Sequence, residues 1–314
     1  MNVTPIRRAL IPGVASLALL LTACGGGDSE GDGASGSVTV DGSSTVYPMS
    51  NAAYELLSEE NSDIEVSVGF SGTGGGFEKF CADETDISDA SRPIKDEEAD
   101  VCAKAGIEYT ELQVATDALT VVVHPDLAVD CLTTDQVIEL FKPGSKAKKW
   151  SDLDPSFPGT DITGYIPGTD SGTYDYMAAD VVEDESETLR EDFQSSEDDN
   201  VLVQGVAGTE GGVGFFGYTY FEENADKVKA LKIDDGKGCV EPSAETAQAG
   251  EYTPLARPLF IYLNNKKYAD NEAVKAYADF YIENLAKIAE GAKFIPLNED
   301  DYAATKSALE GISS

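Results

Sequence analysis

The sequence predicts an α/β protein with largely parallel sheets, because segments patterned like strands alternate with segments patterned like helices. The run ALTVVVHP at 118–125 is apolar for most of its length, as expected of a strand that is buried on both faces. The run GVGFFGYTYF at 212–221 has the same character. Residues 274–288 instead carry apolar side chains at helical spacing.

The first predicted elements follow one another from residue 37. SVTVDG at 37–42 alternates polar and apolar residues like a half-buried strand. An amphipathic helix follows and ends near Glu60, with Pro48 in its first turn, where a missing N–H costs no helical hydrogen bond. IEVSVGF at 64–70 predicts a second strand, which precedes a short helix containing Phe77 and Phe80.

The same alternation continues in the second half of the chain. DITGYIP at 161–167 predicts a strand, and a helix is expected to start near Tyr174. The acidic run at 183–200 is predicted to be a solvated helix face and loop. PLARPLFIYLN at 254–264 predicts a further strand, after which two C-terminal helices are expected.

The first 23 residues have the pattern of an export signal. Arg7 and Arg8 precede an apolar stretch at 9–21 that is too short to span a bilayer comfortably. The ending LTAC resembles the lipobox of bacterial lipoproteins, so Cys24 is the expected lipidation site; the alternative is an ordinary cleaved signal with an incidental cysteine. Residues 24–36 are rich in Gly, Ser and acidic side chains, which predicts a flexible tether.

The charge of the chain excludes some partners. Its 314 residues include 22 basic and 58 acidic side chains, for a formal net charge of −36. Such a surface repels nucleic acid and anionic membranes, so membrane contact is expected only through the lipid anchor. A generally acidic proteome explains this charge without giving it a role in binding.

Four cysteines follow Cys24, and an even number in an exported protein predicts two disulfides. Three pairings are possible. Cys81–Cys102 closes a short local loop and leaves Cys131–Cys239, and we favour this pairing. A metal site needs closer Cys or His spacing, and the sequence has a single histidine, so we expect neither a metal nor a cofactor.

Three segments share the order strand, turn rich in Ser, Thr and Gly, and helix. They are GSST at 42–45, SGTGGG at 71–76 and DSGT at 170–173. Free N–H groups and the helix dipole favour a small oxyanion at a helix start, glycine permits close approach, and hydroxyls donate hydrogen bonds without adding charge. One such turn is usually a helix cap. Three of them predict an oxyanion site.

Other chemical motifs are incomplete. The sequence completes neither G-x-G-x-x-G nor G-x-x-x-x-G-K-[ST], and GFSGT at 69–73 is one glycine short of a nucleophile elbow. DISDASRPI at 86–94 places Arg92 beside Ser91 and before Pro93. Arg92 is therefore a candidate bidentate partner for an oxyanion, and the alternative is a surface ion pair with a carboxylate.

Together these segments resemble the phosphate-binding protein of the bacterial phosphate-specific ABC transporter, the PstS family. The resemblance rests on DGSSTVYP, SGTGGGFEKFC, TDISDASRPI, GTDSGTYDY, EDDNVLVQGVAG and RPLFIY, in that order. It implies a two-lobed type II periplasmic-binding fold, in which each lobe is a mainly parallel sheet flanked by helices and the ligand cleft lies between the lobes. Lobe I would comprise 37–115 plus 257–314, and lobe II 116–256. The crossovers would lie near Ala115–Asp117 and Pro254–Arg257.

The resemblance also implies the residues that bind phosphate. By position, these are Ser44, Thr45, Thr73, Gly74, Ser91, Arg92, Ser171, Gly172 and Thr173. The best-known members have an aspartate, which accepts the phosphate proton, at the position of Ser91, and an arginine where this chain has Pro167-Gly168. We therefore expect Arg92 to supply the positive charge, and Asp170 is the candidate proton acceptor.

The function implied by the resemblance is capture of inorganic phosphate for import, not catalysis. The expected partners are phosphate and the membrane permease of an ABC transporter. The protein would be a monomer, anchored by Cys24 to the outer face of the cell membrane or periplasmic. The rival functions are a binding protein for sulfate or molybdate, an exported phosphate-ester hydrolase, and a surface adhesion or signalling protein that has lost its ligand.

Overall fold

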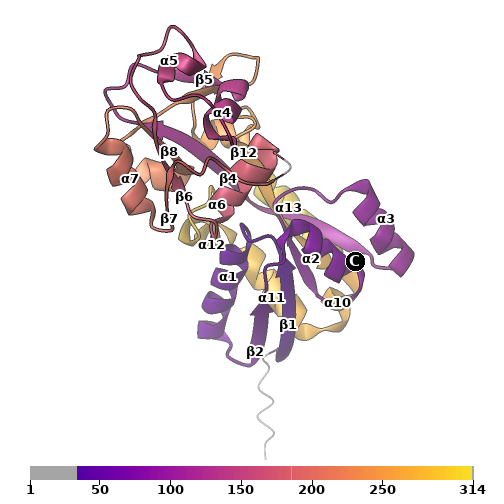
Figure 1. The fold of residues 1–314 in the computed structure, drawn as a ribbon. Coiled ribbons are helices and arrows are strands. Elements are labelled where there is room, and N and C mark those ends of the chain that lie inside the picture. The colour runs from indigo at the N-terminus through magenta and orange to yellow at the C-terminus, as the bar shows by residue number, and fades with distance from the viewer. Residues whose placement is uncertain (1–33, 185, 313–314) are drawn as a thin grey trace, which may run out of the picture. The chain divides into compact units, whose positions relative to one another are not determined.

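The computed structural model describes residues 34–184 and 186–312, which form a mixed α/β fold (Figure 1). The predicted signal at 1–23, Cys24 and most of the predicted tether lie outside these residues. The first half of the described chain contains β1 (Gly36–Gly42), α1 (Tyr47–Glu60), β2 (Ile64–Val68), α2 (Gly72–Cys81), β3 (Ile87–Ala90), α3 (Asp96–Ala105), β4 (Tyr109–Val123), β5 (Cys131–Thr133), α4 (Thr134–Phe141) and α5 (Trp150–Leu153).

The second half begins with β6 (Thr163–Pro167), which leads into α6 (Gly172–Tyr176) and the π-helix η1 (Met177–Val182). The elements that follow are β7 (Gln194–Ser196), α7 (Asp199–Ala207), β8 (Gly212–Gly217), α8 (Tyr218–Glu223), β9 (Lys229–Ala230), β10 (Lys232–Asp234), β11 (Cys239–Val240), α9 (Ala244–Gln248), β12 (Ala256–Asn264), α10 (Asn265–Asp270), α11 (Glu272–Glu283), α12 (Leu285–Gly291) and α13 (Glu299–Ile312).

One sheet joins nine of the strands in the described residues, in the order β2-β1-β3-β12-β4-β8-β6-β7, with β9 paired to β4. The pairs β1–β2, β1–β3, β6–β7 and β6–β8 are parallel, as the alternating pattern predicts. The pairs made by β12 and β4 are antiparallel. The sheet is therefore mixed, because these two strands run in opposite directions between its two parallel parts.

Strand β4 contributes residues to two apolar cores. Its first part pairs with β12 and its last five residues pair with β8. Val114 and Ala115 belong to a core with α1, α11 and α12, whereas Leu119 belongs to a core with α4, α6 and β8. On the neighbouring chain segment, Leu255 lies in the second core and Leu259 in the first. The lobe boundaries implied by the resemblance stay a prediction.

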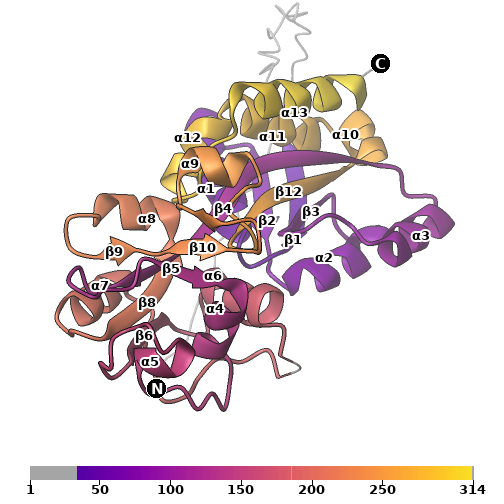
Figure 2. The same cartoon turned by 90° about the horizontal axis from the view of Figure 1, so that it is seen from above.

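A C-terminal segment packs against the middle of β4. Ile295 forms an antiparallel bridge with Thr116 of β4. Helix α13 packs along β4 (Figure 2), and its Thr305 hydroxyl donates a hydrogen bond of 2.9 Å to the carbonyl of Gln113.

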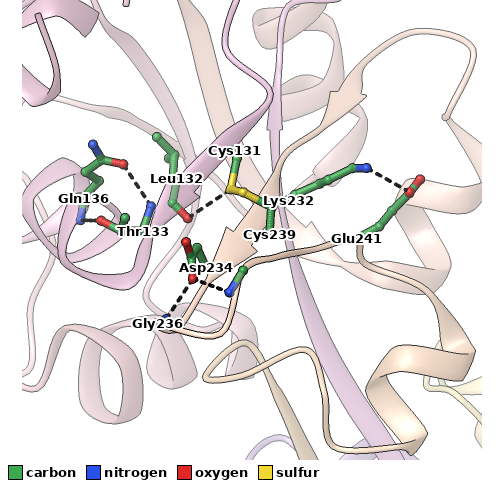
Figure 3. The surroundings of a disulfide bond; sticks show 10 residues. Cys131, Leu132, Thr133, Gln136, Lys232, Asp234, Gly236, Cys239 and Glu241 are labelled. Carbon is green, nitrogen blue, oxygen red and sulfur yellow. Dashed lines mark hydrogen bonds and ion pairs between the residues drawn. A yellow bond between two sulfur atoms is a disulfide. The ribbon is translucent and has the colours of Figure 1, made fainter. Parts of the chain in front are cut away.

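The favoured disulfide pairing is confirmed. Cys81–Cys102 ties the end of α2 to α3. Cys131–Cys239 joins β5 to β11, the two outer strands of a three-stranded sheet whose central strand is β10 (Figure 3).

Several predicted elements differ from the structure. The strand predicted at 118–125 is the end of the longer β4, and the acidic run at 183–200 contains the strand β7 besides loop and helix. The strand predicted at 212–221 ends at Gly217, and α8 begins at Tyr218, because burial on both faces ends there. Residues 274–288 are not one helix: α11 and α12 meet at Asn284, whose side-chain amide donates to the carbonyl of Phe280. With α10 and α13, four helices follow β12 where two were predicted.

Candidate functional site

The first predicted loop, 42–45, connects β1 to α1. The amide of Ser43 donates to the carbonyl of Asp89 on β3, which holds the loop against the neighbouring strand. Gly42 has φ +147°, and a Cβ at this position would lie 2.1 Å from the Asp89 carbonyl oxygen, so the close approach requires glycine. No side chain caps the N-terminus of α1. The amides of Tyr47 and Met49 instead donate to the carbonyls of Ser43 and Val46, and Pro48 has no N–H, so the first loop contributes mainly hydroxyls.

The second loop leads into α2 and is held by Asp41. This carboxylate accepts hydrogen bonds from the amide and hydroxyl of Ser71, and it pairs with Lys79 at 2.6 Å. Burial raises the pKa of Asp41, but the bonds from Lys79 and Ser71 outweigh it and the net pKa is lowered. The hydroxyl of Thr73 lies 3.0 Å from that of Ser91, whose amide also donates to Thr73. Two predicted phosphate residues are thus in direct contact.

Arg92 already has a carboxylate partner in the structure. Its guanidinium forms two parallel hydrogen bonds to Glu98 of α3, of 2.8 and 2.7 Å. The ion-pair alternative considered for Arg92 is therefore realised. The side chain nevertheless lines the cavity described below, where its Nη2 would lie 4.0 Å from a Cβ on Gly74. Cys81–Cys102 joins α2 to α3, so the helix of Gly74 and the helix of Glu98 are covalently linked.

The third loop starts α6 and lies against the first loop. The hydroxyl of Ser171 accepts a hydrogen bond from the amide of Thr173 and caps α6. Thr45 donates to the carbonyl of Gly172 at 3.4 Å, and Ser44 donates to the Asp175 carboxylate at 3.0 Å.

These contacts separate two neighbouring cavities. The arginine cavity, of about 430 Å³, is lined by the predicted residues Ser44, Thr45, Thr73, Gly74, Ser91 and Arg92. The wide cavity, of about 780 Å³, is lined by Asp170, Ser171, Gly172 and Thr173, and it shares Ser44, Thr45 and Asp175 with the arginine cavity. The structure therefore brings six predicted residues together. It places the other three, and the candidate proton acceptor, on the adjoining cavity.

Arg257 is a cavity residue that was not predicted from the sequence; its side chain is 10% exposed and lines the arginine cavity. Its Nη2 donates to the Thr45 hydroxyl at 3.0 Å, and its Nη1 donates to Asp180 at 2.6 Å. Its guanidinium carbon lies 3.6 Å from the centre of the Tyr176 ring. The available signal was weak: a basic residue within RPLFIY, beside a predicted crossover, in a chain with few basic residues.

Carboxylates surround the two arginines. Asp175, Asp180 and Glu187 line the arginine cavity. Asp117 lies behind Arg257, with its Oδ2 3.4 Å from Nε. Burial raises the pKa of Asp117, and the charge of Arg257 opposes that shift. An anion that enters this cavity meets two guanidinium groups, but also at least three acidic side chains.

The described residues contain no group of three or more His, Cys, Asp or Glu side chains placed to hold a metal ion. No helix among them has both the length and the apolar character needed to cross a membrane.

The chain is similar to a known domain family and to characterised relatives. Residues 27–284 match the sequence model of a PBP superfamily domain. The chain is 43% identical over 297 residues to the phosphate-binding protein PstS of Staphylococcus saprophyticus, covering 94% of this chain and 91% of that protein. It is 46% identical over 270 residues to protein SphX of Synechococcus elongatus, covering 85% and 79%.

A solved structure agrees with these matches. The crystal structure of a possible phosphate binding protein from Planctomyces limnophilus has a TM-score of 0.85 and 40% identity, and the match covers 90% of this chain and 100% of that one. The fold and these matches define a periplasmic-binding protein of type II, a class that binds its substrate without transforming it. Within that class, the chain belongs to the PstS family of phosphate-binding proteins.

Proposed function

We propose that the protein captures inorganic phosphate in the arginine cavity and delivers it to an ABC transporter for import. The observation that carries this proposal is the meeting of Arg92 and Arg257 with the hydroxyl-rich loop before α1 and the glycine-rich start of α2 on one small cavity. Guanidinium forks and helix-start amides are the donors that suit a tetrahedral oxyanion. The names of the Staphylococcus and Planctomyces relatives point to the same ligand.

The acidic lining favours phosphate over sulfate. At neutral pH phosphate retains a proton that it can donate to a carboxylate, whereas sulfate has none and meets only repulsion. Asp175 lines both cavities and accepts a hydrogen bond from Ser44, while Asp170 lines the wide cavity alone. We therefore place Asp175 ahead of Asp170 as the acceptor of the phosphate proton.

Ser171, Gly172 and Thr173 complete the proposed site from the other side of the Thr45–Gly172 contact. In this proposal, lobe I (37–115 and 257–314) and lobe II (116–256) move about β4 and β12. Phosphate favours the arrangement in which both lobes contact it, since a ligand shifts a conformational equilibrium by its differential affinity for the two states. The permease then recognises the closed form.

The proposed location is the outer face of the cell membrane, with lipidated Cys24 as the anchor, or the periplasm. The pattern of residues 1–24 supports export, and the acidic composition supports a soluble monomer whose membrane contact is limited to its anchor.

Calorimetric titration of the purified protein tests the ligand. Bound anion is first removed by unfolding and refolding, and the protein is then titrated with phosphate and, separately, with sulfate and molybdate. We expect one phosphate per chain and no heat from the other two anions. If sulfate or molybdate binds as strongly as phosphate, the protein is a general oxyanion-binding protein. If none of the three anions gives binding heat, the proposed function is refuted.

A further inference from the structure

Arg257 is held on three sides by other residues of the chain. Nη1 contacts Asp180, Nη2 contacts the Thr45 hydroxyl, and Nε faces Asp117. The contact with Asp180 is short, at 2.6 Å, whereas Nε and Asp117 Oδ2 are 3.4 Å apart and neither makes a hydrogen bond within the described chain. The guanidinium is therefore engaged more tightly by Asp180 than by Asp117.

The two carboxylates differ in how easily they can leave. Asp117 lies on β4 in register with Arg257 on β12, and its side chain is 4% exposed. It cannot move without its strand. Asp180 lies on η1 and its side chain is 47% exposed, so a change of rotamer turns it into solvent. Asp117 is the fixed partner of Arg257 and Asp180 is the exchangeable one.

Tyr176, the last residue of α6, provides a second contact that does not depend on Asp180. Tyr176 and Asp180 are four residues apart and both face Arg257. The Tyr176 hydroxyl donates to the carbonyl of Pro254 at 2.8 Å, which fixes the ring under the guanidinium. Departure of Asp180 would thus leave Arg257 held by Tyr176, Thr45 and Asp117, with Nη1 directed at the cavity.

We propose that Asp180 is an internal competitor of the bound anion: it occupies Nη1 of Arg257 in the empty protein and yields it when phosphate enters. This inference rests on the proposed function and identifies a residue that sets its affinity and selectivity. A competing internal contact lowers the apparent affinity of a ligand by the fraction of protein in which the site is free. An anion that cannot outcompete a carboxylate for this guanidinium is excluded.

The alternative explanation is simple repulsion, since any carboxylate near the cavity opposes an anion. Glu187 provides the matched control, because it also lines the arginine cavity but forms no hydrogen bond or ion pair with Arg257 in the described chain. Repulsion predicts similar gains in affinity from neutralising either residue. Competition predicts a gain that is confined to Asp180.

The experiment is calorimetric titration of refolded wild-type protein, Asp180→Asn and Glu187→Gln with phosphate and with sulfate, after thermal unfolding has shown that each variant folds. We expect Asp180→Asn to bind phosphate about tenfold more tightly and to gain measurable sulfate binding. Glu187→Gln should change phosphate affinity by about twofold or less.

Equal gains in phosphate affinity in the two variants would show that Asp180 acts by charge repulsion and not by competition, and would overturn the inference. Weaker phosphate binding by Asp180→Asn would show that Asp180 positions Arg257 or contacts the ligand itself, and would also overturn it. Wild-type protein that binds phosphate without any gain in Asp180→Asn refutes the inference alone. Wild-type protein that binds no phosphate refutes the proposed function and removes the inference with it.

Discussion

Thr45 and Gly172, separated by 127 residues in sequence, touch each other at the boundary between the two cavities. The Thr45 hydroxyl donates to the Gly172 carbonyl at 3.4 Å. A Cβ on Gly172 would lie 2.9 Å from both Cα and Oγ1 of Thr45. This contact joins the first and third predicted phosphate loops and leaves no room for a side chain.

Substitution of Gly172 tests whether this approach is needed for binding. Gly172→Ala forces the two loops apart, so we expect phosphate affinity to fall about tenfold, or about 1.4 kcal/mol, in a calorimetric titration. Gly159→Ala is the control, because a Cβ at Gly159 meets no atom within 4 Å. Unchanged affinity in Gly172→Ala would show that the loops need not approach this closely.

Arg92 is predicted to bind phosphate although Glu98 already holds it. Arg92→Ala should weaken phosphate binding by about 100-fold, because a charge-assisted hydrogen bond contributes about 1.5–3 kcal/mol. Lys104→Ala is the control, because Lys104 is an exposed residue of α3. Lys79 is unsuitable as a control, because it forms an ion pair with Asp41, the carboxylate that holds the second loop. If Arg92→Ala lowers phosphate affinity no more than Lys104→Ala does, Arg92 serves only as the ion-pair partner of Glu98 and does not bind phosphate.

Asp89 makes the folding stability depend on pH. This carboxyl is fully buried on β3, and burial raises its pKa to about 8, with a smaller opposing hydrogen bond from Ser50 and a smaller contribution from the charge of Asp41. The folded state therefore keeps a proton that the unfolded chain has released, and stability from this group declines as pH rises from about 4 towards 8.

Asp89→Asn removes that dependence and retains an acceptor for the Ser50 hydroxyl. Relative to wild type, we expect the unfolding free energy of the variant to rise by about 1.4 kcal/mol per pH unit between pH 5 and 8, and then to level off. Urea unfolding at several pH values measures the difference. Parallel curves for the two proteins would mean that Asp89 ionises at its ordinary pKa.

The two disulfides should contribute differently to stability and binding. They join residues 21 and 108 positions apart, for which the chain-entropy relation gives about 3 and about 5 kcal/mol. Replacing both cysteines of a pair by alanine and unfolding the protein in urea tests these values. Loss of Cys81–Cys102 should also weaken phosphate binding, because it links α2 to the helix of Glu98, whereas loss of Cys131–Cys239 should not. Equal effects on affinity would contradict the link to the site.

Much of the fold was predictable because local patterns determine it. The alternating residues of β1, the buried run in β4 and the glycine-rich start of α2 each specify their own element. The pairing Cys81–Cys102 followed from short separation. The end of β8 at Gly217 could not be predicted, because an aromatic run suits a buried strand and a helix equally.

The site was predictable in its loops but not in its charges. Ser44, Thr73 and Ser91 follow strands, so their meeting at one end of the sheet could be expected. Arg257 enters the site through its register with Asp117 and its stacking on Tyr176, which is 81 residues away. No local pattern specifies such a register. The division of the predicted residues between two cavities likewise depends on the long-range contact of Thr45 with Gly172.

The most direct test of the account is a crystal structure of the refolded protein with phosphate. We predict a single phosphate in the arginine cavity, within hydrogen-bond distance of Arg257 Nη1 and of the Ser44–Thr45 and Thr73–Gly74 loops, with the Asp180 carboxylate displaced. Phosphate bound in the wide cavity alone, with Arg257 still paired to Asp180, would contradict both the proposed site and the role of its arginine.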